Sequence, residues 1–234
     1  MEHLGPEHPH VATQISHLGS VLRELGDLAG ARAAFERALR IDEARFGPDH
    51  PNVARDVNNL GLVLHDLGDL ASARSALERA LRIEEARFGR DHPNVAIRLS
   101  SLGRVLQGLG DLAGARAAYE RALKIDEAIF GPDHPNVAAY VNNLGLVLRD
   151  LGDLAGARAA TERALRIGEA SFGPYHPNIA IGINNLGLVL RALGDLPGAK
   201  AAYERALVIF ERALGPDHPS TRTVRGNLES LGGG

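Results

Sequence analysis

The sequence predicts an all-α protein, a solenoid built from antiparallel helix pairs. Two observations carry this prediction: one unit of 42 residues recurs along the chain, and each unit contains two amphipathic helical patterns. Residues 47–88 and 131–172 are identical at 34 of 42 positions, which chance does not produce. No segment with the alternating pattern of a β-strand competes with the helical ones.

The second unit shows how each element is predicted. Asn52–Leu67 carries apolar residues at spacings of three and four, which indicates a first helix. Gly68 follows at the place where a helix often ends in a left-handed residue, and Asp69 can cap the next helix. The second helix is predicted over Leu70–Phe88 and ends at Gly89, after which a proline-containing loop begins the next unit.

The units predict the domain organisation, a single array over residues 1–234. The predicted repeats cover 10–46, 52–88, 94–130, 136–172 and 178–214, and a partial sixth repeat or capping helix covers 219–231. The register of both ends predicts a piece of a longer array, and a complete short protein with minimal caps is the alternative. In either case uncovered apolar end faces would allow self-association through the open repeat ends.

Composition excludes several classes of function. A net charge of -3, from 26 basic and 29 acidic residues, argues against a general nucleic-acid binder. The absence of cysteine excludes disulfides, thiolate catalysis and cysteine-ligated metal. No apolar run is long enough to span a membrane and no secretory signal is recognisable, so we expect a cytoplasmic protein with no membrane partner.

Several residues carry a resemblance to a known family. The spacing of small and apolar residues resembles the tetratricopeptide-repeat (TPR) signature, at Leu60, Gly61, Leu64, Gly68, Ala73, Leu77 and Ala80. Together with the motifs Asp-His-Pro-Asn-Val-Ala, Asn-Asn-Leu-Gly and Glu-Arg-Ala-Leu-Arg-Ile, the 42-residue period is similar to the kinesin-light-chain type of this repeat. The resemblance implies a right-handed superhelix with a concave groove, and the near-identity of the units is typical of bacterial arrays.

Differences between the repeats gather on one face of the first helix. In the second repeat this variable face consists of Arg55, Asn58, Leu62, His65 and Asp66, and the other repeats contribute their equivalents. Spacings of three and four place these positions on one side of a helix. The resemblance implies that this side lines the concave groove and binds a partner.

One register position of the variable face carries amides and hydroxyls: Asn58, Asn142 and Asn184, with Ser16 and Ser100 in the first and third repeats. An Asn side chain can donate and accept at once, so it can pair with the backbone of an extended peptide. The resemblance implies this use, because kinesin-light-chain repeats bind cargo peptides through the equivalent Asn. The alternative is that these side chains only bind neighbouring helix backbone or water.

Other residues of the variable face are cationic or titratable: Arg55, His65, Arg104, Arg149 and Arg191. The guanidinium groups would favour an acidic partner or a C-terminal carboxylate. Glu24, Asp66 and Asp150 lie beside some of them, and a solvated, self-neutralised groove is the alternative.

The histidines and the search for catalytic groups predict no enzyme, metal or cofactor. His8, His50 and their equivalents recur once per repeat, about 10 Å apart, so they cannot converge on one metal ion. A loop and helix-capping role is the better interpretation. No phosphate-binding glycine loop occurs, and no nucleophile, base and orienting group can be assembled.

Two hypotheses for the function follow. The first is a non-catalytic scaffold for protein–protein interaction that binds an extended peptide or partner segment in its groove. The second is a structural or self-assembling repeat spacer, or the sensor segment of a larger signalling protein. One packing oddity is that Thr161 stands where other repeats carry Phe35, Leu77, Tyr119 and Tyr203, which predicts an underfilled layer.

Overall fold

The structure, a computed structural model, describes residues 9–232, and every regular element in that range is an α-helix. The chain divides into two compact units, unit 1 (residues 1–125) and unit 2 (residues 126–234). Unit 1 contains α1 (Pro9–Glu24), α2 (Leu28–Phe46), α3 (Pro51–Asp66), α4 (Leu70–Phe88), α5 (Pro93–Gly108) and most of α6 (Leu112–Phe130). Unit 2 contains α7 (Pro135–Asp150), α8 (Leu154–Phe172), α9 (Pro177–Ala192), α10 (Leu196–Leu214) and α11 (Pro219–Glu229).

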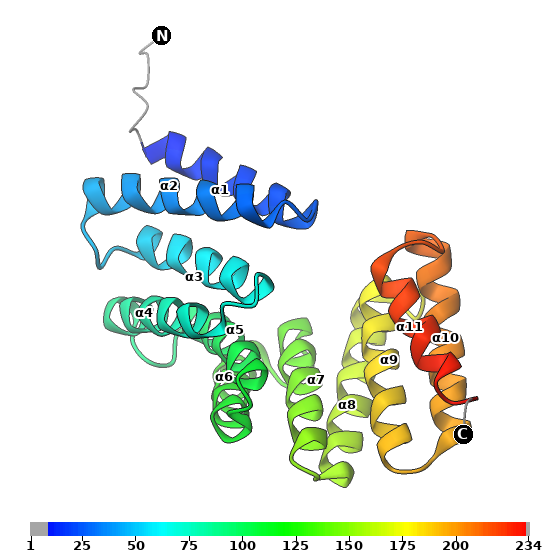
Figure 1. Ribbon diagram of the computed structural model, residues 1–234. Coiled ribbons are helices and arrows are strands. Elements are labelled where there is room, and N and C mark those ends of the chain that lie inside the picture. The colour runs from blue at the N-terminus through cyan, green and yellow to red at the C-terminus, as the bar shows by residue number, and fades with distance from the viewer. Residues whose placement is uncertain (1–8, 233–234) are drawn as a thin grey trace. The chain divides into compact units, whose positions relative to one another are not determined.

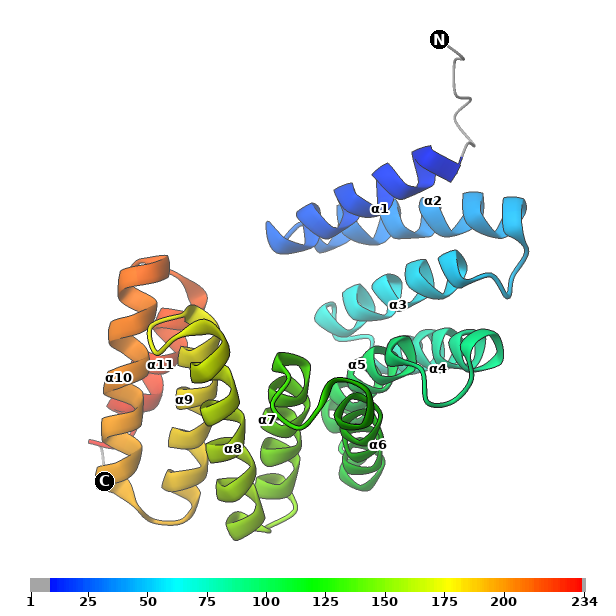
Figure 2. The same ribbon diagram turned by 180° about the vertical axis from the view of Figure 1, so that it is seen from behind.

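Each unit is a stack of helix hairpins in which consecutive helices pack side by side (Figures 1 and 2). The odd-numbered helices also contact one another directly, α1 with α3 and α3 with α5 in unit 1, and α7 with α9 in unit 2. We call the odd-numbered helices the inner helices and the even-numbered ones the outer helices. The all-α solenoid predicted from the repeats is therefore the observed architecture of each unit.

The turns within the hairpins form as the sequence predicts. Gly68 has a φ of 83°, a left-handed conformation that glycine adopts at little cost. The Asp69 side chain then accepts a hydrogen bond from the backbone N–H of Ser72 at 3.2 Å, which caps α4. Both bounds of α3 differ by one residue from the prediction, because the helix begins at Pro51 and ends at Asp66, with Leu67 as its capping residue.

Histidine caps the inner helices at the turns between hairpins. His50 Nδ1 accepts a hydrogen bond from the backbone N–H of Asn52 at 3.2 Å, and the imidazole stacks on Phe46 with ring centres 4.4 Å apart. The same cap recurs at His92, His134, His176 and His218. The predicted capping role is confirmed for these five, and His8 lies outside the described residues.

Small residues let the two helices of a hairpin approach closely. A Cβ atom at Gly61 would lie 2.8 Å from Leu77 Cγ, so only glycine fits between α3 and α4 at this level. In the fourth repeat a Cβ atom at Gly145 would lie 2.8 Å from Thr161 Cγ2. The Thr161 hydroxyl donates to the Ala157 carbonyl at 2.9 Å, so this buried polar group is satisfied within its own helix.

Candidate functional site

In unit 2 the predicted Asn positions belong to a ladder of side-chain amides across the inner helices. Asn185 Nδ2 of α9 donates to Asn142 Oδ1 of α7 at 3.2 Å. Asn227 Nδ2 of α11 donates to Asn184 Oδ1 of α9 at 2.8 Å. Among residues 9–232, no side chain or carbonyl accepts the Nδ2 hydrogens of Asn142 or Asn184. Each amide is therefore held by its oxygen and keeps its two donors for a ligand.

The sequence pattern missed the two partners in this ladder, Asn185 and Asn227. Both lie 43 residues after the oxygen that accepts their hydrogen bond, one position beyond the 42-residue period. A search for polar residues 43 positions apart, instead of 42, would have identified these two partners. The offset arises because adjacent inner helices contact each other through neighbouring, not equivalent, register positions.

In unit 1 the corresponding positions are less accessible than expected. Ser16 is 3% exposed and its Oγ donates to Asp56 Oδ1 at 2.7 Å. Asn58 is 4% exposed, and its Oδ1 is buried without a hydrogen-bond donor among the described residues. Ser100 is half-buried. Neither Ser16 nor Asn58 offers its side chain to a partner, because both side chains are buried.

Arg55 is part of a buried ion cluster at the joint between α2 and α3. Its Nη2 lies 3.0 Å from Asp56 Oδ1 and 3.3 Å from Asp42 Oδ2, and both carboxylates are fully buried. Burial raises the pKa of Asp42 to about 6, Asp56 adds to the shift and Arg55 opposes it. Two acids therefore already balance the charge of Arg55.

A second charged cluster crosses the three inner helices of unit 1. Arg23 Nε of α1 lies 2.5 Å from Asp66 Oδ2 of α3, and His65 Nδ1 lies 3.1 Å from Asp66 Oδ1. Desolvation alone would raise the pKa of Asp66, but the hydrogen bonds from Arg23 and His65 outweigh it and leave the pKa below its usual value. This acid accordingly neutralises Arg23, as the self-neutralised alternative expects.

Arg104 of α5 is left with uncompensated charge in this cluster. Its guanidinium makes no hydrogen bond or salt bridge with any residue in the described range. Desolvation lowers the pKa of Arg104 and repulsion from Arg23 adds to this, while Asp66 opposes it. A cation in this position gains from an incoming carboxylate.

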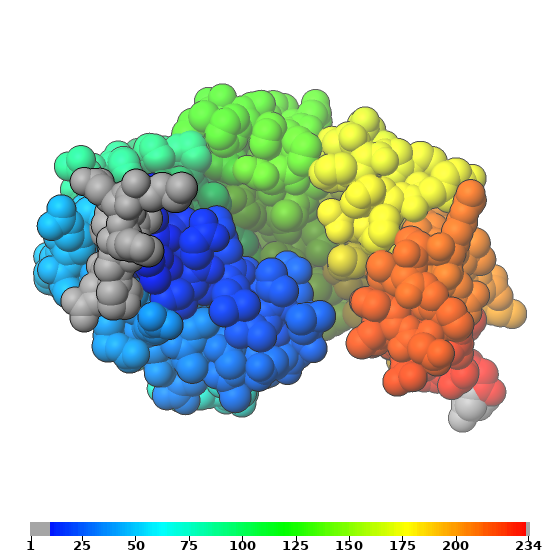
Figure 3. All heavy atoms as spheres, turned by 90° about the horizontal axis from the view of Figure 1, so that it is seen from above, coloured from blue at the N-terminus to red at the C-terminus, as the bar shows by residue number. Residues whose placement is uncertain are grey.

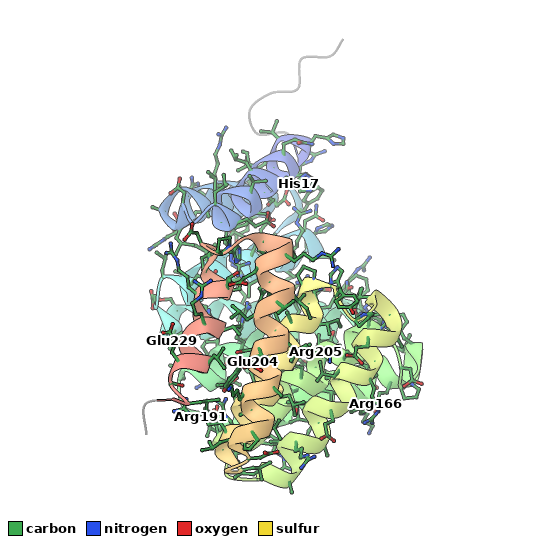
Figure 4. The ribbon with its side chains drawn as sticks, turned by 90° about the vertical axis from the view of Figure 1, so that its right-hand side faces the viewer. His17, Arg166, Arg191, Glu204, Arg205 and Glu229 are labelled. Carbon is green, nitrogen blue, oxygen red and sulfur yellow. The ribbon has the colours of Figure 1, made fainter. Side chains whose placement is uncertain are left out.

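In unit 2, one of the two candidate arginines is paired with a carboxylate and the other is not, as with Arg23 and Arg104 in unit 1. Arg149 Nη2 lies 2.5 Å from Asp150 Oδ1, so its charge is paired. Arg191 Nη1 instead donates to Ser230 Oγ at 2.9 Å, near the end of α11 (Figure 4). No carboxylate of the described residues pairs with Arg191. Arg191, like Arg104, can therefore attract an anion.

A pocket of about 400 Å³ opens beside Asn142, between α7, α8 and α9. Asn142, Asn143, Ala139, Gly168, Phe172 and Ile181 are among its lining residues. The repeat pattern did not single out this pocket. Its signal in the sequence is Gly168, which stands where three other repeats carry Asp42, Glu84 and Asp126.

Residues 9–232 hold neither a metal centre nor a membrane span. No three His, Asp or Glu side chains there gather in a way that could hold a metal ion. In the same range no helix has the length and apolar character needed to cross a membrane.

Comparisons with known proteins agree with this architecture. The family model described as "Tetratricopeptide repeat" matches residues 10–86, 56–128, 99–170, 137–207 and 179–231. No curated protein sequence matches the chain.

Similar solved structures include BtubC (BKLC) from P. vanneervenii, with a TM-score of 0.72 and 26% identity over 90% of this chain and 84% of that one. Another is a protein of Podosopora anserina described as a putative kinesin light chain with nearly identical TPR-like repeats. It has a TM-score of 0.70 and 20% identity over 92% of this chain and 99% of that one. A point variant of the same fungal protein has a TM-score of 0.72 and 19% identity over 88% and 97%. The predicted likeness to kinesin-light-chain repeats is confirmed.

Proposed function

Because the chain belongs to the tetratricopeptide-repeat family, whose members generally serve as scaffolds for protein–protein interaction, we propose that it binds an extended segment of a partner protein along the variable face of its inner helices. The partner segment lies across successive helices, as ligands of solenoid repeats commonly do. Members of this family are typically non-catalytic scaffolds.

The amide ladder of unit 2 is the observation that carries this proposal. Asn142 and Asn184 are fixed through their oxygens, so their Nδ2 donors are ordered before a ligand arrives. Packed helices lie about 10 Å apart, and an extended chain advances about 3.3 Å per residue. The two donors therefore match backbone carbonyls about three residues apart on one bound peptide. An ordered donor costs less entropy on binding than a free one.

Charge supports an acidic partner segment. Arg104 in unit 1 and Arg191 in unit 2 carry positive charge that no described carboxylate pairs with. Charge-assisted hydrogen bonds to a guanidinium are stronger than neutral ones. We therefore expect an Asp, a Glu or a terminal carboxylate in the bound segment. The arginines paired with acids, Arg55 and Arg149, contribute less.

The test is peptide-display selection against the wild-type chain and the Asn142→Ala/Asn184→Ala double variant. Asn52→Ala is the matched control, since it removes the same amide outside the variable face. We expect the wild type and the control to enrich one shared motif that the folded double variant does not enrich. Enrichment of the same motif by the double variant, with its helical circular dichroism intact, would refute the role of the ladder.

A second candidate function is self-assembly, and the observation that favours it is the exposed side of α1 that carries Val21. Val21 is 50% exposed, whereas its equivalents Val63, Val105, Val147 and Val189 are all 0% exposed. Val63 is covered by Ala31 and Phe35 of the preceding outer helix. Figure 3 shows α1 in dark blue with no other described helix over the side that faces the viewer. An outer helix of another copy would bury this face.

Sedimentation velocity over a range of protein concentrations tests this candidate. If copies stack through α1, the sedimentation coefficient rises with concentration, and Val21→Asp abolishes the rise. The control Val208→Asp, at an exposed valine of α10, leaves it unchanged. A coefficient independent of concentration in all three proteins would contradict self-assembly through this face.

A further inference from the structure

We call the place where the outer helix of one repeat packs against the inner helix of the next repeat a joint. At each joint, a residue of the outer helix faces the residue of the inner helix that lies 14 positions later in the chain. The pairs are Asp42/Asp56, Glu84/Arg98, Asp126/Tyr140, Gly168/Gly182 and Phe210/Val224. At the second joint, for example, Arg98 Nη2 lies 2.9 Å from Glu84 Oε1. Four joints are thus filled by buried or largely buried side chains, and the fourth has no side chain at either position.

The glycine pair leaves a pocket at the fourth joint. It has a volume of about 400 Å³, within the range of ligand sites, and it lies entirely within unit 2. Ile179 takes up part of the space, since its Cδ1 lies 2.7 Å from where a Cβ atom of Gly168 would be. The equivalents Val53, Val95 and Val137 lack this extra methyl group. The enlarged side chain compensates for only part of the missing volume.

The pocket opens onto the variable face. Its lining includes Ala139, Asn142 and Ile181, which occupy variable-face positions, and Ala139 and Ile181 are exposed. A chain that lies across α7 and α9 and contacts the Asn142 amide would therefore pass over the mouth of the pocket.

The lining selects an apolar group. Leu165, Phe172, Ile179 and Ile181 provide aliphatic and aromatic walls, and no Asp, Glu, Lys, Arg or His lines the pocket. A charged group would lose hydration there without gaining a partner. The polar groups are amides, contributed by Asn136, Asn142, Asn143 and Asn178. This combination suits an apolar side chain attached to a polar peptide backbone.

We propose that the fourth joint is an anchor pocket that takes one aromatic or long aliphatic side chain of the bound segment, while Asn142 Nδ2 donates to a neighbouring backbone carbonyl. The inference rests on the proposed function and names the feature of the ligand that the glycine pair selects. The acidic residues of the same segment lie outside the pocket.

Two variants fill the pocket with residues that the array already uses at other joints. G168D/I179V/G182Y copies Asp126, Val137 and Tyr140 from the preceding joint, and G168F/I179T/G182V copies Phe210, Thr221 and Val224 from the following one. Two variants with different side chains are used so that the result does not depend on how well one set of side chains packs in the pocket. Ala155→Tyr is the control, because it adds a phenol to an exposed position in the first turn of the same helix, α8.

Two kinds of probe are used with each folded protein. The first kind is the peptides selected on the wild type, each with an alanine scan. The second is N-acetyl-phenylalaninamide, N-acetyl-leucinamide and N-acetyl-alaninamide, followed through the methyl resonances of Leu165 and Ile181. We expect one apolar peptide position whose change to Ala weakens binding at least about tenfold. We expect each filled variant to lose as much affinity for the selected peptide as that alanine change causes, and the control variant to bind as the wild type does. The phenylalanine and leucine amides shift the two methyl signals of the wild type, and the alanine amide does not.

The outcomes separate the anchor pocket from the proposed function. If both filled variants bind the selected peptides as the wild type does, the anchor pocket is refuted and peptide binding stands. If no peptide is selected but the phenylalanine amide shifts the methyl signals, the site takes a small apolar molecule and the peptide proposal is wrong. If nothing binds, both are overturned.

Discussion

Arg79 of α4 reaches back to Glu43 of α2, with Nη2 2.6 Å from Oε1, and also donates to the Pro48 carbonyl at 3.1 Å. It thereby ties two successive outer helices and the loop between them. The same bridge recurs between Arg163, Glu127 and the Pro132 carbonyl in unit 2. Neighbouring repeats are thus joined by directed polar contacts in addition to their apolar cores.

The first prediction concerns this bridge. Arg79→Ala removes an ion pair and a backbone hydrogen bond that are about two-thirds shielded from solvent, and we expect a loss of about 1 kcal/mol in the free energy of unfolding. Arg74→Ala is the control, because Arg74 pairs only with Glu78 on its own exposed helix face. Urea unfolding should show the larger loss for Arg79→Ala. Equal losses would mean that the bridge between repeats adds nothing beyond an ordinary surface pair.

The second prediction concerns the glycines between inner and outer helices. A Cβ atom at Gly187 would lie 2.5 Å from Tyr203 Cε1, so Gly187→Ala must separate α9 from α10 and should cost about 1–3 kcal/mol. At Gly226 of α11 nothing lies within 4 Å of such an atom. Gly226→Ala should therefore stabilise the protein by about 0.5–1 kcal/mol through helix propensity. Thermal unfolding of both variants checks the opposite signs, and a shift in the same direction would contradict the packing argument.

The third prediction is a pH dependence that originates at Asp42. Burial first, and then Asp56, raise the pKa of Asp42 to about 6 in the folded protein, against about 4 when unfolded. Between these values the folded state binds the extra proton, so the free energy of unfolding falls as the pH rises from about 4 to about 6.

Asp42→Asn removes this loss, because the amide has no charge to desolvate. We expect the variant to gain about 2 kcal/mol relative to the wild type between pH 4 and pH 7. Urea unfolding of both proteins at several pH values measures the difference, which cancels the contributions of all other groups. Parallel stability curves would show that folding leaves the pKa of Asp42 unchanged, which would contradict the prediction.

The fourth prediction concerns the histidine caps. His92 accepts a hydrogen bond from the Asn94 N–H at 3.2 Å and stacks on Phe88. We expect His92→Ala to cost about 1 kcal/mol, and His92→Ser to recover part of that loss because a hydroxyl can also cap the helix. The midpoint of thermal unfolding ranks the three proteins. A serine variant no more stable than the alanine variant would assign the effect to the ring stack instead of the cap.

Local features of the fold could be predicted from the sequence because they depend on neighbouring residues. Gly68, Asp69 and His50 each act on backbone within three residues of themselves, and all three do so as predicted. The helix bounds follow from the same signals. The period of 42 residues then supplies the architecture, since each hairpin can only bury its apolar face against the next.

The site was harder to predict because its contacts join different repeats at an offset from the period. Asn142 is held by Asn185, and Arg23 by Asp66, both 43 residues apart. Comparing equivalent positions therefore places Ser16 on the variable face but does not show that Asp56 draws its hydroxyl into the interior. The sequence shows Gly168 and Gly182 as departures from the repeat, but the pocket could not be predicted from either one, because it depends on both helices at once.

Binding along the inner helices can be observed at its proposed donors, by following the side-chain amide resonances of Asn142 and Asn184 by NMR while a peptide selected on the wild type is added. We expect both NH₂ signals to shift in a saturable way and at the same peptide concentration, while the Asn52 signal does not move. Saturable binding that leaves both signals unchanged would contradict this expectation, because the partner would then lie elsewhere than along the inner helices.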